Sequence, residues 1–276
     1  MDFIKQREFF VGIDSDGTAF DSMRIKHTLS FIPAAIEVFG IEERYQKQFI
    51  QIEEKINLYS LTRGINRFPG LLMSFEELKR QMHYSVGDTT DFEKYINSGF
   101  PLSNKGLSDY MEENPSVFLG KVMEWSLLAD KYFDKGCEGI EPFSPIPKTL
   151  KKMQEAADIM VVSAASQKGL ERDWSQSGIS QSVSFIAGQE FGKKKEQLLF
   201  AKEKGYSPDK MLMLGDAPGD FEAAEGAGVL FYPIIPRQEE KSWEELFNKN
   251  FDMFINGEYT KEVQNHLYEK FIDTLK

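Results

Sequence analysis

Segments with the pattern of buried parallel strands are distributed unevenly along this chain of 276 residues. One such segment lies near the start, at residues 9–13, and the others follow residue 140, at 159–162, 183–187, 211–214 and 229–232. After residue 140 the strand segments alternate with helical ones, which favours a parallel sheet with right-handed crossovers. Placing residues 9–13 in that sheet makes the stretch from 22 to 138 an insertion. The sequence therefore predicts an α/β core formed by 1–21 and 139–276, and an inserted, mainly α-helical cap domain at 22–138.

Apolar residues three and four positions apart predict the helices of both parts. In the insertion they are expected at 27–39, 42–60, 74–84, 107–113 and 115–134, with Ser74 and Ser108 as caps. The Gly-, Pro- and Asn-rich stretches 61–72 and 86–104 are expected to be loops. In the α/β part, helices are expected at 145–157, 168–177, 193–204, 220–226 and 260–275, and a last strand at 251–255.

Charge and composition exclude several kinds of partner. The net charge of −11 offers no basic field for a nucleic acid or an anionic membrane. No segment approaches the ~20 apolar residues of a membrane span, and the charged N-terminus lacks the pattern of a signal peptide. A single cysteine, Cys137, allows no internal disulfide and fits a reducing compartment. We therefore expect a cytoplasmic protein, a monomer or a homodimer, that acts on a small molecule.

Two carboxylates follow the first predicted strand, at the position where it ends. Asp14 and Asp16 are two residues apart, so in an extended segment both side chains point the same way. Gly17 allows a sharp turn after them, and Thr18 adds a hydroxyl group. The carboxyl ends of parallel strands are where open α/β sheets bind ligands. The alternative is an ordinary acidic turn after a strand.

Three further polar groups lie at the ends or starts of elements in the α/β part. Ser163 and Ala164 follow the strand at 159–162, where a hydroxyl and exposed amides can hold an anion. Lysines 193–195 open the helix at 193–204, where the helix dipole disfavours them unless an anion is near. Asp216 and Asp220 follow the strand at 211–214. A helix cap, a solvated face and a turn would explain each one alone, but together they supply the parts of a phosphoryl-transfer site.

These residues resemble the motifs of the haloacid dehalogenase superfamily, in its phosphatase form. The run Asp14-Ser15-Asp16-Gly17-Thr18 with Asp21-Ser22 is similar to the first motif, Ser163 to the second, and Gly215-Asp216 with Asp220 to the fourth. The resemblance implies a Rossmann-like three-layer core with a helical cap. Separation from the fourth motif favours Lys193 as the lysine of the third motif, and Lys194 and Lys195 compete with it.

The resemblance also implies a chemistry for each matched position. Asp14 would attack the phosphorus of a small phosphorylated metabolite and form an aspartyl phosphate, while Asp16 would exchange protons with the leaving group and with water. Mg²⁺ would be held by Asp14, by the backbone carbonyl of Asp16, and by Asp216 and Asp220. Ser163 and Lys193 would hold the transferring oxygens, with Thr18 and Ala164 also facing the substrate.

Asp16 separates the phosphatases and phosphomutases of the superfamily from its dehalogenases, which lack an acid there. A phosphomutase and a non-catalytic binding module remain as alternatives to a phosphatase.

In the cap, Arg63 and Arg67 lie in the predicted loop at 61–72. Planar guanidinium groups in a loop could clamp an anionic or polyhydroxylated substrate. The alternative is an ordinary loop between helices, whose arginines bind helix carbonyls or surface acids.

Overall fold

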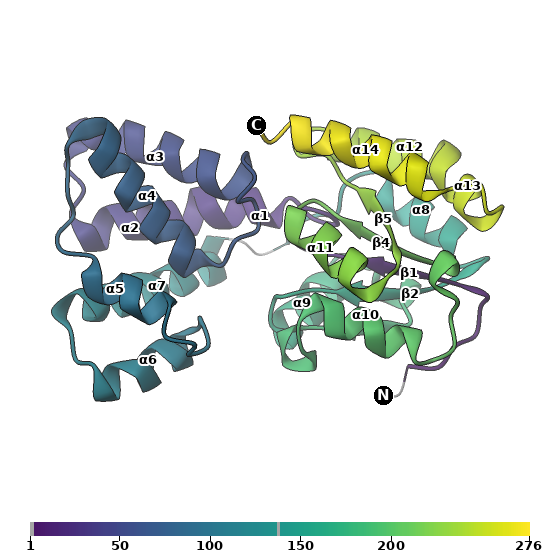
Figure 1. The fold of residues 1–276 in the computed structure, drawn as a ribbon, viewed down its shortest axis with the longest axis horizontal. Helices are drawn as coiled ribbons and strands as arrows, with labels where there is room; N and C mark the ends of the chain where they lie inside the picture. The colour runs from purple at the N-terminus through teal and green to yellow at the C-terminus, as the bar shows by residue number, and fades with distance from the viewer. Residues whose placement is uncertain (1–2, 137–138) are drawn as a thin grey trace. The chain divides into compact units, whose positions relative to one another are not determined.

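The structure, a computed structural model, describes residues 3–136 and 139–276, so Cys137 lies outside the described residues. The described chain forms two compact units, shown in Figure 1. Residues 3–23 with 139–276 form the core unit, and residues 24–136 form the cap unit. The core unit has two apolar clusters and the cap unit has one of its own.

The core unit is built on a sheet of five parallel strands in the order β3-β2-β1-β4-β5. The first strand along the chain lies at the centre of the sheet, where Phe9 pairs with Ala157 of β2 and Phe10 with Met211 of β4. The strands are β1 (Phe9–Ile13), β2 (Ala157–Val162), β3 (Phe185–Ala187), β4 (Met211–Gly215) and β5 (Leu230–Pro233). This confirms the predicted α/β fold with its Rossmann-like parallel sheet.

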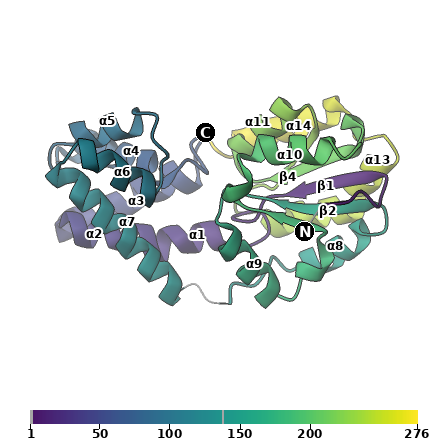
Figure 2. The ribbon, with the colours of Figure 1, turned by 90° about the horizontal axis from the view of Figure 1, so that it is seen from below.

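Alternate residues of each strand enter two separate apolar cores, one on each face of the sheet. Val11 and Ile13 pack into a core that includes Trp174 and Trp243, whereas Phe10 packs into a core on the other face. Figure 2 shows α8 and α9 on one face and α10, α11 and α14 on the other. The helices are α8 (Ile146–Met153), α9 (Gln167–Gln176), α10 (Lys194–Lys202), α11 (Pro218–Ala227), α12 (Glu239–Glu245), α13 (Phe251–Ile255) and α14 (Lys261–Asp273).

The predicted strand at 251–255 is wrong, because these residues form helix α13. Phe251 and Phe254, three residues apart, are the buried side chains of this segment, which is the spacing of a helix face. A short apolar run does not distinguish a strand from a buried helical turn. Helix α12, which the sequence patterns did not reveal, carries the buried Trp243.

The cap unit consists of helices joined by loops, and its described residues contain no strand. Its apolar core contains the fully buried side chains of Phe49, Phe68, Leu71 and Trp125, among others. Its helices, with α1 leading in from the core unit, are α1 (Ser22–Lys26), α2 (Ile32–Phe39), α3 (Glu43–Leu58), α4 (Arg67–Met82), α5 (Thr90–Ile96), α6 (Asn104–Glu113) and α7 (Val117–Gly136), with a π-helical segment at His27–Phe31.

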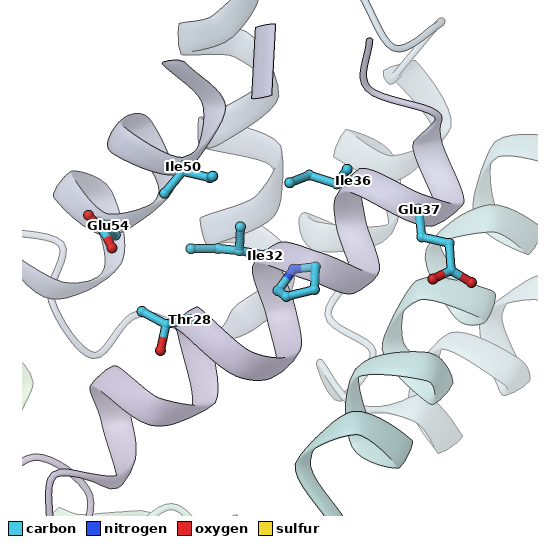
Figure 3. A pocket seen from close by; sticks show the side chains of 7 residues that line it. Thr28, Ile32, Ile36, Glu37, Ile50 and Glu54 are labelled. Atoms are coloured by element: carbon cyan, nitrogen blue, oxygen red, sulfur yellow. The ribbon is translucent and has the colours of Figure 1, made fainter. Parts of the chain in front are cut away.

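Between α2 and α3 the cap unit carries a pocket of about 390 Å³ (Figure 3). Its lining is mostly aliphatic, with two carboxylates: Thr28, Ile32, Pro33, Ile36, Glu37, Ile50 and Glu54. None of the residues expected to carry the chemistry lines it.

Three expectations for the cap helices are wrong in detail. Helix α4 begins at Arg67, inside the expected loop, because the Asn66 side chain accepts a hydrogen bond from Phe68 N at 3.0 Å. Ser74 therefore lies within this helix rather than at its start. Similarly, α5 lies in the expected loop at 86–104, and Ser103 caps α6 in place of Ser108. A proline tolerated in the first turn made the start of α4 resemble a loop.

Among the described residues, no helix combines the length and the apolar composition that a membrane span requires.

Candidate active site

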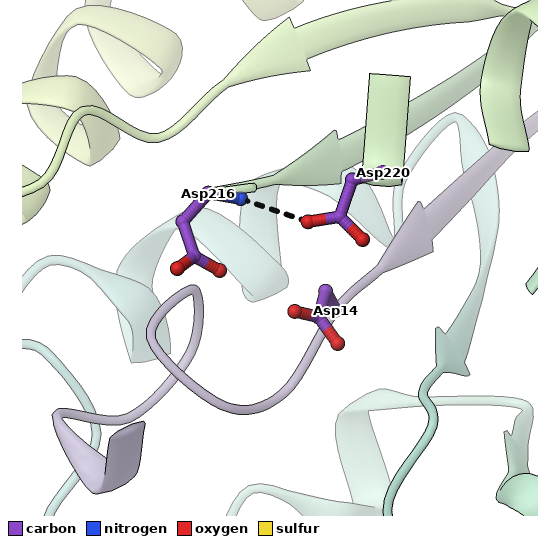
Figure 4. A group of neighbouring side chains, drawn as sticks. All are labelled: Asp14, Asp216 and Asp220. Atoms are coloured by element: carbon purple, nitrogen blue, oxygen red, sulfur yellow. Dashed lines mark hydrogen bonds between the residues drawn. The ribbon is translucent and has the colours of Figure 1, made fainter. Parts of the chain in front are cut away.

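Three buried carboxylates meet at the carboxyl end of the central strands (Figure 4). Asp14 follows β1 and its backbone N–H donates to Leu214 O of β4 at 3.0 Å, which links the two strand ends. Asp216 follows β4, and Asp220 lies in the first turn of α11. One oxygen of each carboxylate lies within 4.8 Å of the others, and the three residues are 0–3% exposed.

Asp220 is fixed by the backbone at the start of α11. Its Oδ2 accepts from Asp216 N at 3.1 Å and from Ala217 N at 3.0 Å. Gly215 makes this approach possible, since a Cβ at that position would lie 2.3 Å from the Asp220 Cβ. The carboxylate thereby satisfies amides of the helix N-terminus and still presents Oδ1 to the site.

Lys194 supplies the cation of this cluster. Its Nζ lies 2.9 Å from Asp14 Oδ1 and 2.5 Å from Asp220 Oδ1. Lys193, which motif separation favoured, is exposed and precedes the helix, where its backbone N–H donates to Glu196 at 2.7 Å. The assignment of Lys193 to the carboxylate cluster is therefore corrected to Lys194.

Helical spacing is the physical reason for this correction. The buried residues of α10 are Gln197, Leu198 and Ala201, which stand three, four and seven positions after Lys194. These positions share one face of a helix, so Lys194 faces the sheet while Lys193 and Lys195 face solvent. The sequence carried this signal.

The cluster has more carboxylates than cationic groups to balance them. Burial raises the pKa of Asp14 well above its ordinary value; Lys194 opposes this shift, and the carboxylates of Asp220 and Asp216 add to it. Burial disfavours the charged form of Lys194, but Asp14 and Asp220 outweigh it and hold the pKa of this lysine above its ordinary value. One ammonium among three buried carboxylates leaves a site that a divalent cation fits, and hard oxygen donors suit Mg²⁺.

Thr18 and Asp16 occupy different positions in the turn after Asp14. Thr18 is buried and donates its hydroxyl to Asp216 Oδ1 at 2.5 Å, so it orients a carboxylate of the cluster. Asp16 is half-buried and accepts a hydrogen bond from the Ser22 hydroxyl. Gly17 between them has φ of +81°, the left-handed conformation that favours glycine, and its N–H closes the turn onto Phe20 O at 2.8 Å.

Ser163 lies at the end of β2, beside the end of β1. It is 1% exposed, its N–H donates to Ala187 O at 3.1 Å, and its Oγ accepts from Ala165 N at 3.1 Å. The cap of helix α9 is Ser166 rather than Ser163. Ala164 next to it is exposed.

Comparison with known families places the chain in one of them. The model of the haloacid dehalogenase-like hydrolases matches residues 64–234, more than half of the chain. The chain belongs to this family of hydrolases. A search of curated proteins finds no match to the sequence.

Solved structures of such hydrolases share the fold at low sequence identity. A predicted phosphoglycolate phosphatase from Haemophilus somnus is 16% identical, with a TM-score of 0.53 over 86% of this chain and 93% of that one. A hydrolase from Pseudomonas syringae is 14% identical, with a TM-score of 0.52 over 89% and 99% of the two chains. A family hydrolase from Deinococcus radiodurans, with bound phosphate and sodium, is 13% identical, with a TM-score of 0.50 over 84% and 83%.

The two cap arginines of this hydrolase are engaged within the cap unit. Arg63 is buried and donates from Nη1 to Leu58 O at 2.6 Å, at the end of α3. Arg67 forms an ion pair with Asp130 at 2.6 Å. These are the contacts with a helix carbonyl and a surface acid that the alternative interpretation of this segment describes.

Sequence reasoning missed Gln197, which organises the same edge of the sheet. This residue is fully buried, and its Nε2 lies 2.9–3.0 Å from the carbonyl oxygens of Ser163, Gly188 and Gly192. It therefore ties the ends of β2 and β3 to the start of α10, where Lys194 begins the helix. The signal in the sequence is a polar residue on the apolar face of an amphipathic helix.

Proposed function

We propose that this hydrolase is a Mg²⁺-dependent phosphomonoesterase that acts on a small phosphorylated metabolite through a phosphorylated Asp14. The observation that carries the proposal is the contact of Lys194 with both Asp14 and Asp220, next to Asp216. A nucleophilic carboxylate, a cation for the transferring oxygens and a set of hard metal ligands are what phosphoryl transfer through an aspartate requires. The phosphatase name of the Haemophilus somnus protein and the phosphate bound to the Deinococcus radiodurans hydrolase support the substrate class.

Asp14, Asp216 and Asp220 would hold the metal, together with the backbone carbonyl of Asp16. The donor set fits, because three buried carboxylates within 4.8 Å of one another carry more negative charge than Lys194 offsets. Bound there, Mg²⁺ would neutralise charge on the phosphoryl oxygens.

The residues of the chain divide the remaining chemistry. An oxygen of Asp14 attacks the phosphorus, the bond from phosphorus to the ester oxygen breaks, and Asp16 gives its proton to the departing alkoxide. In the second half, Asp16 takes a proton from water, the water oxygen attacks the phosphorus, and Asp14 leaves as a carboxylate with release of inorganic phosphate. The Ser22 hydroxyl donates a hydrogen bond to Oδ1 of Asp16 and so orients this carboxylate.

Lys194 and Ser163 would hold the phosphoryl group during both steps. Lys194 already contacts the attacking carboxylate, so its ammonium lies where charge develops in the transition state. The Ser163 hydroxyl accepts from Ala165 N, which orients the hydroxyl proton away from the backbone. Ala164, an exposed residue, can add a backbone N–H donor.

A phosphate-release screen tests this proposal. The full chain with Mg²⁺ is assayed on p-nitrophenyl phosphate and on sugar phosphates, nucleoside monophosphates and phospho-acids, with EDTA as the metal-free control. D14N and D16N should lose turnover, and D109N, at an exposed carboxylate paired with Lys105, should keep it. Turnover that survives in D14N would remove Asp14 as nucleophile. Isomerised sugar phosphate without release of phosphate would instead indicate a phosphomutase.

A further inference from the structure

The turn that carries the two catalytic carboxylates, residues 14–20, is called here the Asp14 loop. Its backbone closes on itself: Ser15 O accepts from Ala19 N at 2.9 Å and from Phe20 N at 3.1 Å. Ser15 is 2% exposed and lies between Asp14 and Asp16. Neighbouring side chains of an extended segment point to opposite sides, so Ser15 is expected to point away from the side that its two neighbours share.

A tryptophan of helix α9 holds the loop at this residue. The Nε1–H of Trp174, a fully buried side chain, donates to Ser15 Oγ at 3.1 Å. The same ring meets Phe20, at the far end of the loop, edge to face with centroids 5.7 Å apart. One indole therefore contacts both ends of the Asp14 loop.

A second tryptophan holds the loop at its middle. The Nε1–H of Trp243, from α12, donates to Thr18 O at 2.8 Å, and this side chain is also fully buried. Thr18 in turn donates its hydroxyl to Asp216. Thr18 therefore connects Trp243 to the carboxylate cluster through two hydrogen bonds.

A buried indole N–H requires an acceptor, and most acceptors in a protein interior are carbonyl groups of regular elements. Here two of the three tryptophans of the chain find their acceptors within one seven-residue loop. The third, Trp125, donates to Phe31 O at 3.0 Å inside the cap unit. The two tryptophans of the core unit therefore both donate to the Asp14 loop, from two different helices.

We propose that Trp174 and Trp243 are positioning residues, which fix the Asp14 loop so that Asp14 and Asp16 project to the same side. The inference rests on the proposed phosphatase function, because the loop carries both carboxylates. Small displacements of a nucleophile cost large factors in rate. The other contacts of the loop, such as Asp14 N with Leu214 O and Phe143 N with Ala19 O, hold its two ends, whereas the two indoles hold Ser15 and Thr18 within it.

Kinetics of four variants test the inference: W174F, S15A, the double variant and W125F. Phenylalanine keeps an aromatic ring but removes the N–H donor together with part of the buried indole, whereas S15A removes only the acceptor hydroxyl. Loss of one buried hydrogen bond predicts a fall in kcat of about 3- to 10-fold in W174F and in S15A, with KM for p-nitrophenyl phosphate unchanged. The double variant should fall no further than W174F, because both changes remove the same bond.

W125F is the matched control, since it removes a buried indole hydrogen bond of similar length from the cap unit. It should lower the thermal midpoint as W174F does, yet keep kcat. A fall of kcat in W125F equal to that in W174F would overturn the inference, as would an unchanged kcat in S15A and W174F. W243F, expected to behave like W174F, provides a second and independent anchor variant.

A measurement without turnover separates this inference from the proposed function. The three indole N–H resonances are assigned from the Trp→Phe variants, and their hydrogen exchange is compared in wild type and S15A. S15A should speed hydrogen exchange at the Trp174 indole N–H and leave the rate at Trp125 unchanged. An exchange rate at Trp174 that is equal in S15A and wild type would overturn the role of Trp174 as an anchor of the loop. If no phosphate ester is hydrolysed, the proposed function fails and this comparison still decides whether the loop is held.

Discussion

Replacing Lys194 with Met removes the one ammonium that contacts the carboxylate cluster in the described structure. Its Nζ makes two charge-assisted hydrogen bonds, to Asp14 and to Asp220, and the side chain is 18% exposed. Bonds of this kind contribute about 1.5–3 kcal/mol each, so their gross loss is about 3–6 kcal/mol. In the metal-free protein Asp14, whose pKa is already raised, can take up a proton and recover part of this loss. We therefore expect a net loss of about 2–4 kcal/mol in the free energy of unfolding.

That loss should appear as a fall of about 4–16 °C in the thermal midpoint, given about 2–4 °C per kcal/mol for chains of this size. With Mg²⁺ and p-nitrophenyl phosphate, kcat should fall by about 10²–10³-fold, the effect of removing one preorganised donor from a developing charge. Mg²⁺ should raise the midpoint of K194M more than that of the wild type, because no ammonium then competes with the metal for the carboxylates.

The matched control is K193M, one residue earlier and exposed. It should change the free energy of unfolding by less than about 0.5 kcal/mol, as is usual for surface positions, and leave kcat within about twofold. Loss of activity in K193M with retention in K194M would refute the placement of the lysine. A midpoint in K194M equal to that of the wild type would refute the electrostatic reasoning.

Three further predictions, with four variants, test other parts of the structure. D14N should abolish turnover and yet raise the thermal midpoint of the metal-free protein. Because the pKa of Asp14 is higher in the folded than in the unfolded state, the wild type loses stability as pH rises above the ordinary pKa of an aspartate. The gain of D14N over wild type should therefore grow from about pH 4 upward in thermal scans. A gain that shrinks with rising pH would contradict this. D158A removes the acceptor of Gln6 N, Arg7 N and the Tyr206 hydroxyl, and should lower the free energy of unfolding in urea by about 1–3 kcal/mol. An unchanged urea midpoint would show that these contacts do not stabilise the fold. G70A places a Cβ 2.2 Å from Asn57 Oδ1 and should cost about 1–3 kcal/mol, whereas G120A, with no atom within 4 Å, should gain up to about 1 kcal/mol; equal midpoints for the pair would disprove the clash.

The sheet was predictable from the sequence because its strands are short apolar runs separated by helices. The bounds of all five strands were expected within two residues of those observed, and the strand expected at 183–187 is the shorter strand Phe185–Ala187. The segment 251–255 was not predictable, because its four apolar residues, with Asp252 among them, fit a strand and a buried helical turn equally well. There the three-residue spacing of Phe251 and Phe254 decided in favour of a helix.

The site was predictable in its residue types and only partly in its contacts. Strand ends indicated where Asp14 and Asp216 would meet, since the ends of parallel strands lie at one edge of a sheet. Separation between motifs selected Lys193, whereas the buried face of α10 selects Lys194. The direction in which a side chain leaves the helix therefore decided which lysine reaches the cluster, and the separation along the chain did not. The contacts of Trp174 and Trp243 with the Asp14 loop join segments more than 150 residues apart, and no local pattern reports such a contact.

The central position of β1 has a consequence for the order in which this protein is made. Phe9 of β1 pairs with Ala157 and Phe10 with Met211, so the strand that leads to Asp14 has no partner strand until residues far along the chain have been synthesised. Strand pairings between residues this distant in the sequence form late, whereas the helices of the cap contact residues that are closer in the sequence and can fold first. We expect nascent chains stalled near residue 170 to protect the cap from proteolysis while the segment around Asp14 is still cleaved. Protection of that segment at the same length would contradict the expected order. Synthesis would thus complete the carboxylate cluster only after Asp216 and Asp220 have emerged.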